Sequence, residues 1–362
     1  MKNQVRHIIL SPFALIYGIV TGIRNWLFDQ DILPSTSFNI PTISVGNLAV
    51  GGTGKTPHTE YLLSALQSQW KTAVLSRGYK RKTKGFKLAD NNSTSRTLGD
   101  EPFQIYKKFP NVTVSVDEKR VHGVKKLQEI IPDLQLVVLD DAFQHRYIEA
   151  GLSILLTDFS NLYSRDMLLP AGHLREWRSG SKRANIIVIT KCPRDMKPIE
   201  MRIYETELNP ETNQSLFFSC FVYDELIPVF PESVKQSWTF QKIKEANASV
   251  LLVAGIVSPE PILEQLANYT NNVHTLFFED HHAFLPKDFN LINKRFEAIS
   301  STEKIILVTE KDAARLVSSP DFPESLKTRT FALPIRVKIL HDQETLFIQK
   351  IQDYVVENSR NS

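Results

Sequence analysis

The sequence predicts an α/β protein in which mainly parallel strands form sheets that helices cover on both faces. Short runs rich in β-branched residues alternate with helical patterns along most of the chain. These runs are apolar from end to end, as expected for strands that are buried on both faces. With 362 residues, 42% of them apolar and 23% charged, the chain has a globular composition and is long enough for two cores.

The first half of the chain shows the alternation most clearly. Six strands are expected there, at residues 41–46, 72–78, 112–116, 134–141, 152–159 and 185–191. The helices between them are expected at residues 56–69, 101–109 and 119–130. A sheet of buried strands with helices on both faces gives a three-layer α/β/α domain.

The second half has a weaker rhythm from about Asn209 onward. Its expected strands are residues 215–223, 249–256, 273–280, 304–312 and 331–339, with helices from about 259 and 287. A final helix at 344–358 could pack on either half. We therefore expect an N-terminal segment at 1–28, a core domain at 29–225 and a smaller α/β domain at 226–362.

The N-terminal segment contains an uncharged stretch, residues 8–23, between basic residues such as Arg6 and Arg24. A membrane-spanning helix needs about 20 apolar residues, and Pro12 interrupts this stretch of 16. No small-residue cleavage site of the kind that ends a signal peptide follows it. We expect an apolar helix that either lies in a membrane interface or caps the core.

Overall charge and cysteine content say little about the function of the protein. A net charge of +3 is too small to argue for a nucleic-acid partner, and nothing in the sequence indicates an obligate protein partner. The two cysteines, Cys192 and Cys220, cannot form a disulfide framework. We expect both to be core thiols in a reducing compartment.

The segment "VGNLAVGGTGKTP", residues 45–57, predicts a phosphate-binding loop between a strand and a helix. Ala49 stands where the usual G-x-x-x-x-G-K-[ST] pattern has its first glycine. Three glycines remain to supply the tight turn. In such a loop the backbone N–H groups and the helix N-terminus bind phosphates, the lysine reaches the β and γ oxygens, and the threonine binds Mg²⁺. The expected nucleotide site comprises Ala49, Val50, Gly51, Gly52, Thr53, Gly54, Lys55 and Thr56.

The segment "LQLVVLDD", residues 134–141, is an apolar strand that ends in two carboxylates. Open α/β sheets bind ligands at the carboxyl ends of their strands. Asp140 or Asp141 is therefore expected to hold magnesium opposite Thr56.

The type of P-loop protein depends on further motifs. A GTPase switch would carry D-x-x-G and N-K-x-D, and neither is complete here. A transfer enzyme needs a base near an acceptor hydroxyl. Asp100 in "LGDEPF" is either a helix cap or such a base, and His281 and His282 in "FFEDHHAF" are either surface residues or catalysts. The basic stretch at 77–87 suits an anionic substrate or a lipid headgroup.

Seven motifs in this order resemble the tetraacyldisaccharide 4′-kinase family of lipid A biosynthesis. They are "VGNLAVGGTGKTP", "LSRGY", "GDEPF", "VVLDDAFQHR", "LLPAGHLREW", "FFEDHHAF" and "VTEKDAARL", and the resemblance runs from about residue 8 to about residue 320. It implies a P-loop kinase that transfers the γ-phosphoryl group of ATP to the 4′-hydroxyl of a tetraacylated glucosamine disaccharide 1-phosphate, giving lipid IVA. It also implies a peripheral or monotopic enzyme on the cytoplasmic face of the inner membrane.

The resemblance also implies roles for individual residues. Asp100 would accept the hydroxyl proton with His281 as its partner, although only the alignment of "DHH" favours His281 over His282. Lys55 would stabilise the charge on the γ-phosphoryl group. Mg²⁺ would be organised by Thr56 and Asp141, with Asp140 and Glu176 as further candidates. Substrate phosphate or nucleotide would be met by Arg77 and Arg175.

Two other classes of function are weighed against the kinase. A membrane-attached P-loop NTPase that acts as a switch or chaperone is weakened by the incomplete guanine motif. A nucleotide-binding scaffold without chemistry is weakened by the complete set of Lys55, Thr56, Asp140 and Asp141.

Overall fold

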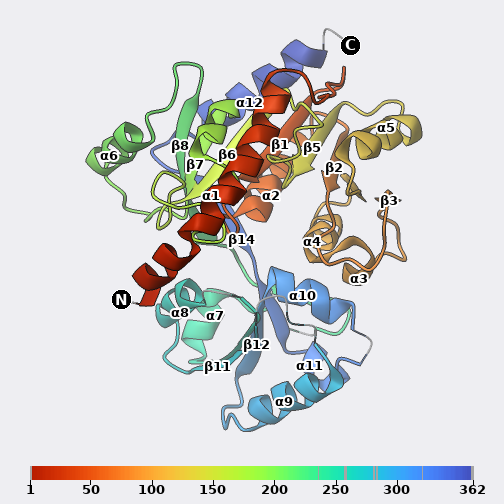
Figure 1. Ribbon diagram of the computed structural model, residues 1–362. Helices are drawn as coiled ribbons and strands as arrows, with labels where there is room; N and C mark the ends of the chain where they lie inside the picture. Colours follow the sequence, from red (N-terminus) through yellow and green to blue (C-terminus); the bar gives the residue numbers. More distant parts are fainter. Residues whose placement is uncertain are drawn as a thin grey trace. The chain divides into compact units, whose positions relative to one another are not determined.

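The computed structural model describes residues 2–234, 236–256, 259–279, 282, 284–319 and 321–359, with side chains from residue 9 onward (Figure 1). The chain forms two compact units. Unit 1 comprises Met1–Asn92, Ile105–Phe221 and Val337–Ser362, and unit 2 comprises Ser93–Gln104 and Val222–Arg336. The segment Ser93–Gln104 thus groups with unit 2 although its flanks belong to unit 1. The division into 1–28, 29–225 and 226–362 stays a prediction.

Unit 1 is built on a sheet with the strand order β14-β8-β7-β6-β1-β5-β2-β4-β3. Its strands are β1 (Thr42–Asn47), β2 (Thr72–Ser76), β3 (Lys87–Leu88), β4 (Thr113–Val116), β5 (Leu136–Asp140), β6 (Leu152–Asp158), β7 (Ile186–Thr190), β8 (Ser215–Tyr223) and β14 (Ile335–Ile339). Strand β1 lies in the middle and pairs in parallel with β5 and β6. The loop after β1 therefore leaves the sheet at its centre.

Helices cover both faces of this sheet. They are α1 (Lys2–Asp29), α2 (Lys55–Leu66), α5 (Arg120–Ile130) and α12 (Glu344–Ser359), together with α4 (Asp100–Lys108), which begins in unit 2 and ends in unit 1. Ile43 and Val45 of β1 share a core with α2 and α12, whereas α1 and α5 contribute to cores with other strand residues. Figure 1 shows α1 crossing in front of the strands. The expected three-layer α/β/α arrangement is confirmed.

Unit 2 contains a smaller sheet with the order β11-β10-β12-β13-β9. Its strands are β9 (Ile227–Pro228), β10 (Ser249–Ala254), β11 (Val273–Phe277), β12 (Lys304–Thr309) and β13 (Thr330–Leu333). Its helices are α3 (Ser95–Leu98), α7 (Phe240–Glu245), α8 (Glu260–Ala267), α9 (Pro286–Glu297), α10 (Glu310–Val317) and α11 (Glu324–Lys327). Two apolar cores, one including Phe289 and the other Trp238, pack against this sheet. A second, smaller α/β body was expected from the sequence.

Three elements of secondary structure differ from the sequence expectation or settle a point that it left open. The strand expected at 331–339 is divided at Pro334 into β13 and β14, which belong to different sheets, because proline fixes φ and cannot donate to a ladder. The final helix α12 packs in unit 1, where Phe347 and Ile351 are buried. Helix α6 (Pro198–Leu208) was not anticipated, since none of its side chains is buried.

We predict that Tyr354→Phe destabilises unit 1. The Tyr354 hydroxyl accepts a hydrogen bond from the Thr42 N–H at 3.1 Å and donates one to the Thr42 carbonyl at 3.1 Å, fastening α12 to β1. Thr42 is 2% exposed, and leaving a buried N–H unpaired costs about 1–3 kcal/mol. Urea unfolding should show this loss, whereas Tyr79→Phe, at a side chain that is 60% exposed, should leave stability unchanged. Equal stability of the two variants would contradict the prediction.

Candidate functional site

The candidate nucleotide site begins where β1 passes through residues 48–54 into α2. Gly51 and Gly54 have φ values of 116° and 89°, a region that glycine adopts without steric cost. Ala49, in place of the usual glycine, is buried and bridges Leu174. The first N–H groups of α2 have no acceptor within the helix. The helix terminus thus offers N–H groups of the kind that bind anions.

The carbonyl groups of Thr53 and Gly54, at the end of this loop, are bonded to the protein. The Thr190 hydroxyl of β7 donates to the Thr53 carbonyl at 2.8 Å. The His58 Nδ1 atom of α2 lies 2.8 Å from the Gly54 carbonyl. Bonds on both sides of the left-handed Gly54 fix the direction of the peptide groups that begin α2.

His58 itself is held by Ser219 of β8, whose hydroxyl lies 2.9 Å from His58 Nε2. Because a neutral imidazole has one donor and one acceptor nitrogen, Nδ1–H donates to Gly54 and the Ser219 O–H donates to Nε2. Burial lowers the pKa of His58 to about 4, although the bond to Gly54 opposes the shift. The imidazole is therefore neutral at pH 7 and tethers the loop to the sheet.

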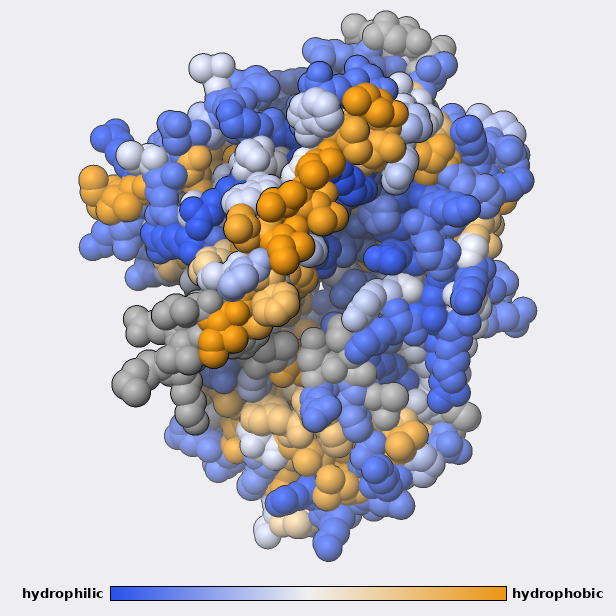
Figure 2. Space-filling model, in the orientation of Figure 1, coloured by the Kyte–Doolittle hydropathy of each residue, from blue (hydrophilic) through white to orange (hydrophobic). Residues whose placement is uncertain are grey.

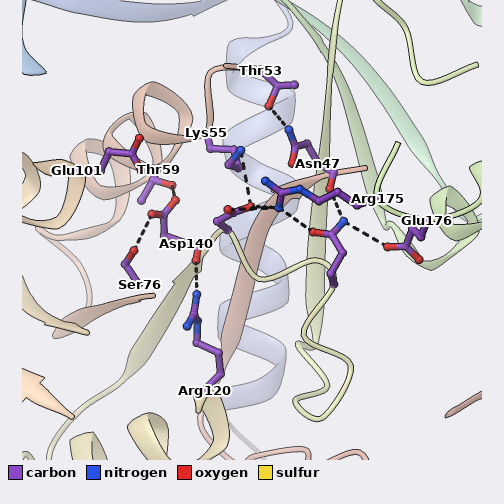
Figure 3. A network of polar contacts seen from close by, with 12 residues as sticks. Asn47, Thr53, Lys55, Thr59, Ser76, Glu101, Arg120, Asp140, Arg175 and Glu176 are labelled. Carbon is purple, nitrogen blue, oxygen red and sulfur yellow. Dashed lines mark hydrogen bonds and ion pairs between the residues drawn. The ribbon is translucent and has the colours of Figure 1, made fainter. Parts of the chain in front are cut away.

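The two acids at the end of β5 lie in different surroundings, and Figure 3 shows Asp140 with its partners Thr59, Ser76 and Arg120. Asp140 is 1% exposed and accepts hydrogen bonds from Thr59 at 3.3 Å and Ser76 at 3.1 Å. Its backbone carbonyl accepts from the Arg120 guanidinium at 3.2 Å. Thr59 lies one turn after the start of α2, so Asp140 is directed toward the phosphate loop.

Asp141 is paired with cations instead. It lies 3.7 Å from Lys55 Nζ and 3.3 Å from Arg175 Nη1. Burial raises its pKa, but Lys55, Arg175 and Arg120 outweigh that effect and hold the pKa of this carboxyl below its ordinary value. The structure thus brings together three of the sequence-predicted site residues, with Asp141 ionised between two positive charges.

Gln144 connects this group to Glu176. Its side-chain oxygen accepts from Arg175 at 3.3 Å, and its amide nitrogen donates to the Asn47 carbonyl at 2.5 Å and to Glu176 at 3.3 Å. Glu176 is 3% exposed. Its carboxylate accepts hydrogen bonds from Arg183 at 2.9 Å and from Asn25 of α1 at 2.7 Å. The carboxylate of Glu176 therefore already has three donors, whereas the carboxylate of Asp141 contacts Lys55 and Arg175.

Arg77 lies beyond the end of β2 and is exposed. Its charge acts on the buried Arg120 and on the half-buried His145. Burial lowers the pKa of Arg120 to about 10, against the pull of Asp140 and Asp141. Burial and the charges of Arg120 and Arg77 lower the pKa of His145 to about 4. His145 is thus a neutral imidazole in basic surroundings.

Asp100, the expected base, is the first residue of α4 and belongs to unit 2. Arg315 of α10 donates to its Oδ2 atom from Nε at 2.9 Å and from Nη2 at 2.8 Å. His281 lies outside the described residues. His282 bonds Asp288 at 2.9 Å and stacks on Phe278 with 4.6 Å between ring centroids. This gives His282 a structural role in the loop before α9.

Sequence reasoning gave no role to Gln144, Arg120 or His58. Gln144 stands within a quoted motif, but the sequence does not show which residues the side chain of a glutamine on a loop contacts. His58 follows the phosphate loop by two residues, and only the position of Ser219 in space shows that it bonds back to Gly54. In the described part of the chain, no three His, Cys, Asp or Glu side chains gather as a metal site.

We predict a pH-dependent stability that depends on His58. The pKa of this imidazole is about 4 in the fold against 6.5 in the unfolded chain. The unfolded chain therefore takes up the proton first, and the stabilisation present above pH 6.5 is lost as the pH falls toward 4, up to about 3 kcal/mol.

Urea unfolding at pH 7.5 and pH 5 measures this loss. His58→Gln should be less stable than the wild type at the higher pH and should lose less stability between the two. The exposed His274 of β11 offers the control variant His274→Gln, which should keep the wild-type difference. A wild-type difference in His58→Gln would contradict the assignment.

Comparison with known proteins identifies the family of this chain. A model of the family described as tetraacyldisaccharide-1-P 4′-kinase matches residues 6–355. A tetraacyldisaccharide 4′-kinase of Bacteroides thetaiotaomicron is 50% identical over 358 residues, which cover 98% of this chain and 94% of the relative. One from Bacteroides fragilis strain YCH46 is 47% identical over 362 residues, covering 99% and 96%.

Among solved structures, the fold resembles LpxK from Aquifex aeolicus, crystallised in complex with ATP. The TM-score is 0.74 at 28% sequence identity, with 96% of this chain and 99% of that chain covered. The resemblance expected from seven motifs is confirmed over nearly the whole length. The chain belongs to the tetraacyldisaccharide 4′-kinase family.

Proposed function

We propose that this kinase transfers the γ-phosphoryl group of ATP to the 4′-hydroxyl of tetraacyldisaccharide 1-phosphate, giving lipid IVA in lipid A biosynthesis. The observation that carries the proposal is the phosphate loop with Lys55, Asp141 and Arg175 in contact at its edge. Family membership supports the acceptor, and the ATP complex of the Aquifex relative supports the donor. Phosphoryl transfer depends mainly on positioning and on stabilising charge, and these residues supply both.

In this proposal the loop from Ala49 to Thr56 binds the phosphates of ATP. The N–H groups at the start of α2 donate to the phosphate oxygens, and Lys55 stabilises the charge on the transferred group. Arg175, 29% exposed in its side chain, is proposed to meet substrate phosphate or nucleotide. Arg77 is proposed to meet the phosphate of the lipid substrate.

Magnesium is part of the proposal, and the residues present fit it. Mg²⁺ prefers oxygen ligands and usually binds one or two carboxylates together with waters and substrate phosphates. Thr56 and Asp141 offer such oxygens, with Asp140 beside them, whereas Glu176 is already engaged by three donors. The ion would neutralise charge on the β- and γ-phosphates.

Asp100 is proposed to accept the proton of the acceptor hydroxyl, with His281 as its partner. A positioned base of this kind contributes about 10²–10⁴ to a rate. The ion pair with Arg315 favours the ionised form of the Asp100 carboxylate, which is the form that a base needs. The competing role as a helix cap is worth only about 1 kcal/mol of stability.

The proposed activity predicts label transfer from radiolabelled ATP to the lipid. The protein is incubated with Mg²⁺ and tetraacyldisaccharide 1-phosphate in detergent micelles, and the labelled lipid is separated from free phosphate. Asp100→Ala should lower turnover by about 10²–10⁴. Glu101→Ala, at the next residue of α4, is the matched control.

Two results would decide against parts of this proposal. Free phosphate that appears regardless of lipid, with no label in the lipid, would show an NTPase rather than a lipid kinase. A loss of less than tenfold in Asp100→Ala would leave that residue as a helix cap. The two results can be distinguished, because the first concerns the acceptor of the phosphoryl group and the second concerns only the base.

We further propose that α1 binds the membrane in which the lipid substrate lies, at the cytoplasmic face of the inner membrane. One side of α1 packs on unit 1 through Ala14 and Gly18, and the Tyr17 hydroxyl donates to the Arg175 carbonyl at 2.8 Å. The other side exposes an apolar band, visible along α1 in Figure 2. It consists of Ile9, Phe13, Leu15, Ile16, Ile19, Val20, Ile23 and Trp26, each 51–62% exposed.

This band fits a helix that lies in the interface. No helix in the described ranges has both the length and the apolar character needed to cross a bilayer. A helix with one packed side and one exposed apolar side can bury the latter in the headgroup region. A substrate with four acyl chains stays in the bilayer, since each buried CH₂ contributes about 0.8 kcal/mol, so the kinase has to reach it there.

We predict that Ile16→Glu combined with Val20→Glu weakens binding to phospholipid vesicles. Two apolar side chains no longer enter the bilayer, which should reduce partitioning at least tenfold at about 1.5–3 kcal/mol each. Vesicle co-sedimentation measures the change. Ile199→Glu with Ile203→Glu on α6 is the control, because these residues are also exposed, at 63% and 59%, and have the same spacing. Equal loss in both pairs would contradict a specific role for α1.

A further inference from the structure

The environment of Asp100 contains a chain of buried charges. Arg315 of α10 is 7% exposed in its side chain and reaches two carboxylates. Its Nε and Nη2 atoms bond Asp100 Oδ2, while its Nη1 atom donates to Asp312 Oδ1 at 2.8 Å. A guanidinium is a rigid planar fork, so fixing one edge of Arg315 fixes the direction of the other.

Asp312 provides the fixed edge. Its side chain is fully buried, and its Oδ2 atom accepts from the Gly255 N–H at 3.0 Å and the Thr309 hydroxyl at 2.8 Å. Thr309 in turn caps α10, where its Oγ1 accepts from the Asp312 N–H at 3.1 Å. Asp312 is thus held by the end of β10 and by the start of α10, which are two rigid elements of unit 2.

A purely structural role does not explain this arrangement well. A buried ion pair costs desolvation that its own attraction barely repays, and a helix start needs only Thr309 to be capped. Both bonds from Arg315 to Asp100 end on the same oxygen atom, Oδ2. The carboxylate is therefore held by a cation whose own position Asp312 fixes.

We propose that Arg315, oriented by Asp312, is a positioning residue for the Asp100 carboxylate in the kinase reaction. The proposal rests on the proposed role of Asp100 as base and names the residues that make it effective. Arg315 acts through Asp100 and not on the substrate. Among the described residues, Glu101 of α4 and Lys311 of α10 form a neighbouring ion pair at 3.8 Å.

Arg315→Gln removes the charge and Arg315→Lys keeps it but removes the fork. In the glutamine variant kcat should fall between about 10- and 100-fold, because a small misplacement of a reacting group has an effect of this size. The acid limb of its kcat profile should move up by about one pH unit or more, because an opposite charge favours the ionised carboxylate. The lysine variant should lose kcat but keep its acid limb near the wild-type position. KM for ATP should stay unchanged in both.

Arg295→Gln is the matched control, since it removes the same charge from an exposed position on α9. Thermal unfolding checks that every variant is folded, because removal of Arg315 leaves Asp312 buried without its cation. Asp312→Asn, which keeps the shape of the side chain, should lower kcat in the same direction and serves if Arg315→Gln does not fold.

The double variant Asp100→Asn with Arg315→Gln separates this inference from the proposed function. If Arg315 acts through Asp100, the double variant should be no slower than Asp100→Asn alone. Losses that multiply in the double variant, or wild-type kcat and acid limb in folded Arg315→Gln, would overturn the inference. Nearly full activity of Asp100→Asn would instead overturn the role of Asp100 itself.

Discussion

The phosphate site depends on the left-handed Gly54 and on the buried imidazole that bonds its carbonyl. Residue 54 has to turn the chain from an exposed loop into α2, and a φ of 89° is what makes that turn. His58 belongs to the helix that the turn begins, and Ser219 belongs to β8, which lies three strands from β1 in the sheet. The loop is therefore fixed by the sheet as a whole and not by its own sequence alone. A protonated His58 could no longer accept a hydrogen bond from Ser219. The low pKa keeps the imidazole neutral and so preserves the bond that holds the loop.

Hydrogen bonds connect α1 directly to the proposed phosphate site. Asn25 of α1 donates to Glu176, and Glu176 connects through Gln144 to Arg175 and Asp141. The polar side of α1 therefore bonds the same residues that surround Lys55, while its other side exposes the apolar band. In the proposed function the lipid substrate stays in the bilayer, so the phosphate donor has to be held at a fixed height above the membrane. A direct chain of hydrogen bonds from the proposed membrane helix to the site achieves that without a flexible joint.

The sequence predicted the parts of this site that depend on local pattern. The glycine-rich turn, Lys55 and Thr56 follow from spacing, and the acids at 140 and 141 follow from an apolar strand that ends in charge. It did not predict the contacts of Glu176, which a motif marked as a metal candidate but whose carboxylate is occupied by Arg183 and Asn25. Nor did it predict the break at Pro334, because apolar residues continue on both sides of the proline and the sheets that the two strands join are set by the rest of the chain. Pairwise contacts between distant segments, such as that of Arg315 with Asp100, leave no mark on either local sequence.

The adjacent acids Asp140 and Asp141 have different partners because a single backbone angle turns the side chain of Asp141. Successive residues of a strand point to opposite faces of the sheet, so two acids in a row would not both face α2. Asp141 leaves the strand with a φ of 47°, a conformation that aspartate tolerates better than most residues. Its side chain thereby reaches Lys55, while Asp140 reaches Thr59 one turn further along the same helix. One acid is then held by neutral hydroxyl donors and the other by cations. The first is fixed in orientation and the second in charge, which are the two properties that the proposed site for a metal-bound nucleotide requires.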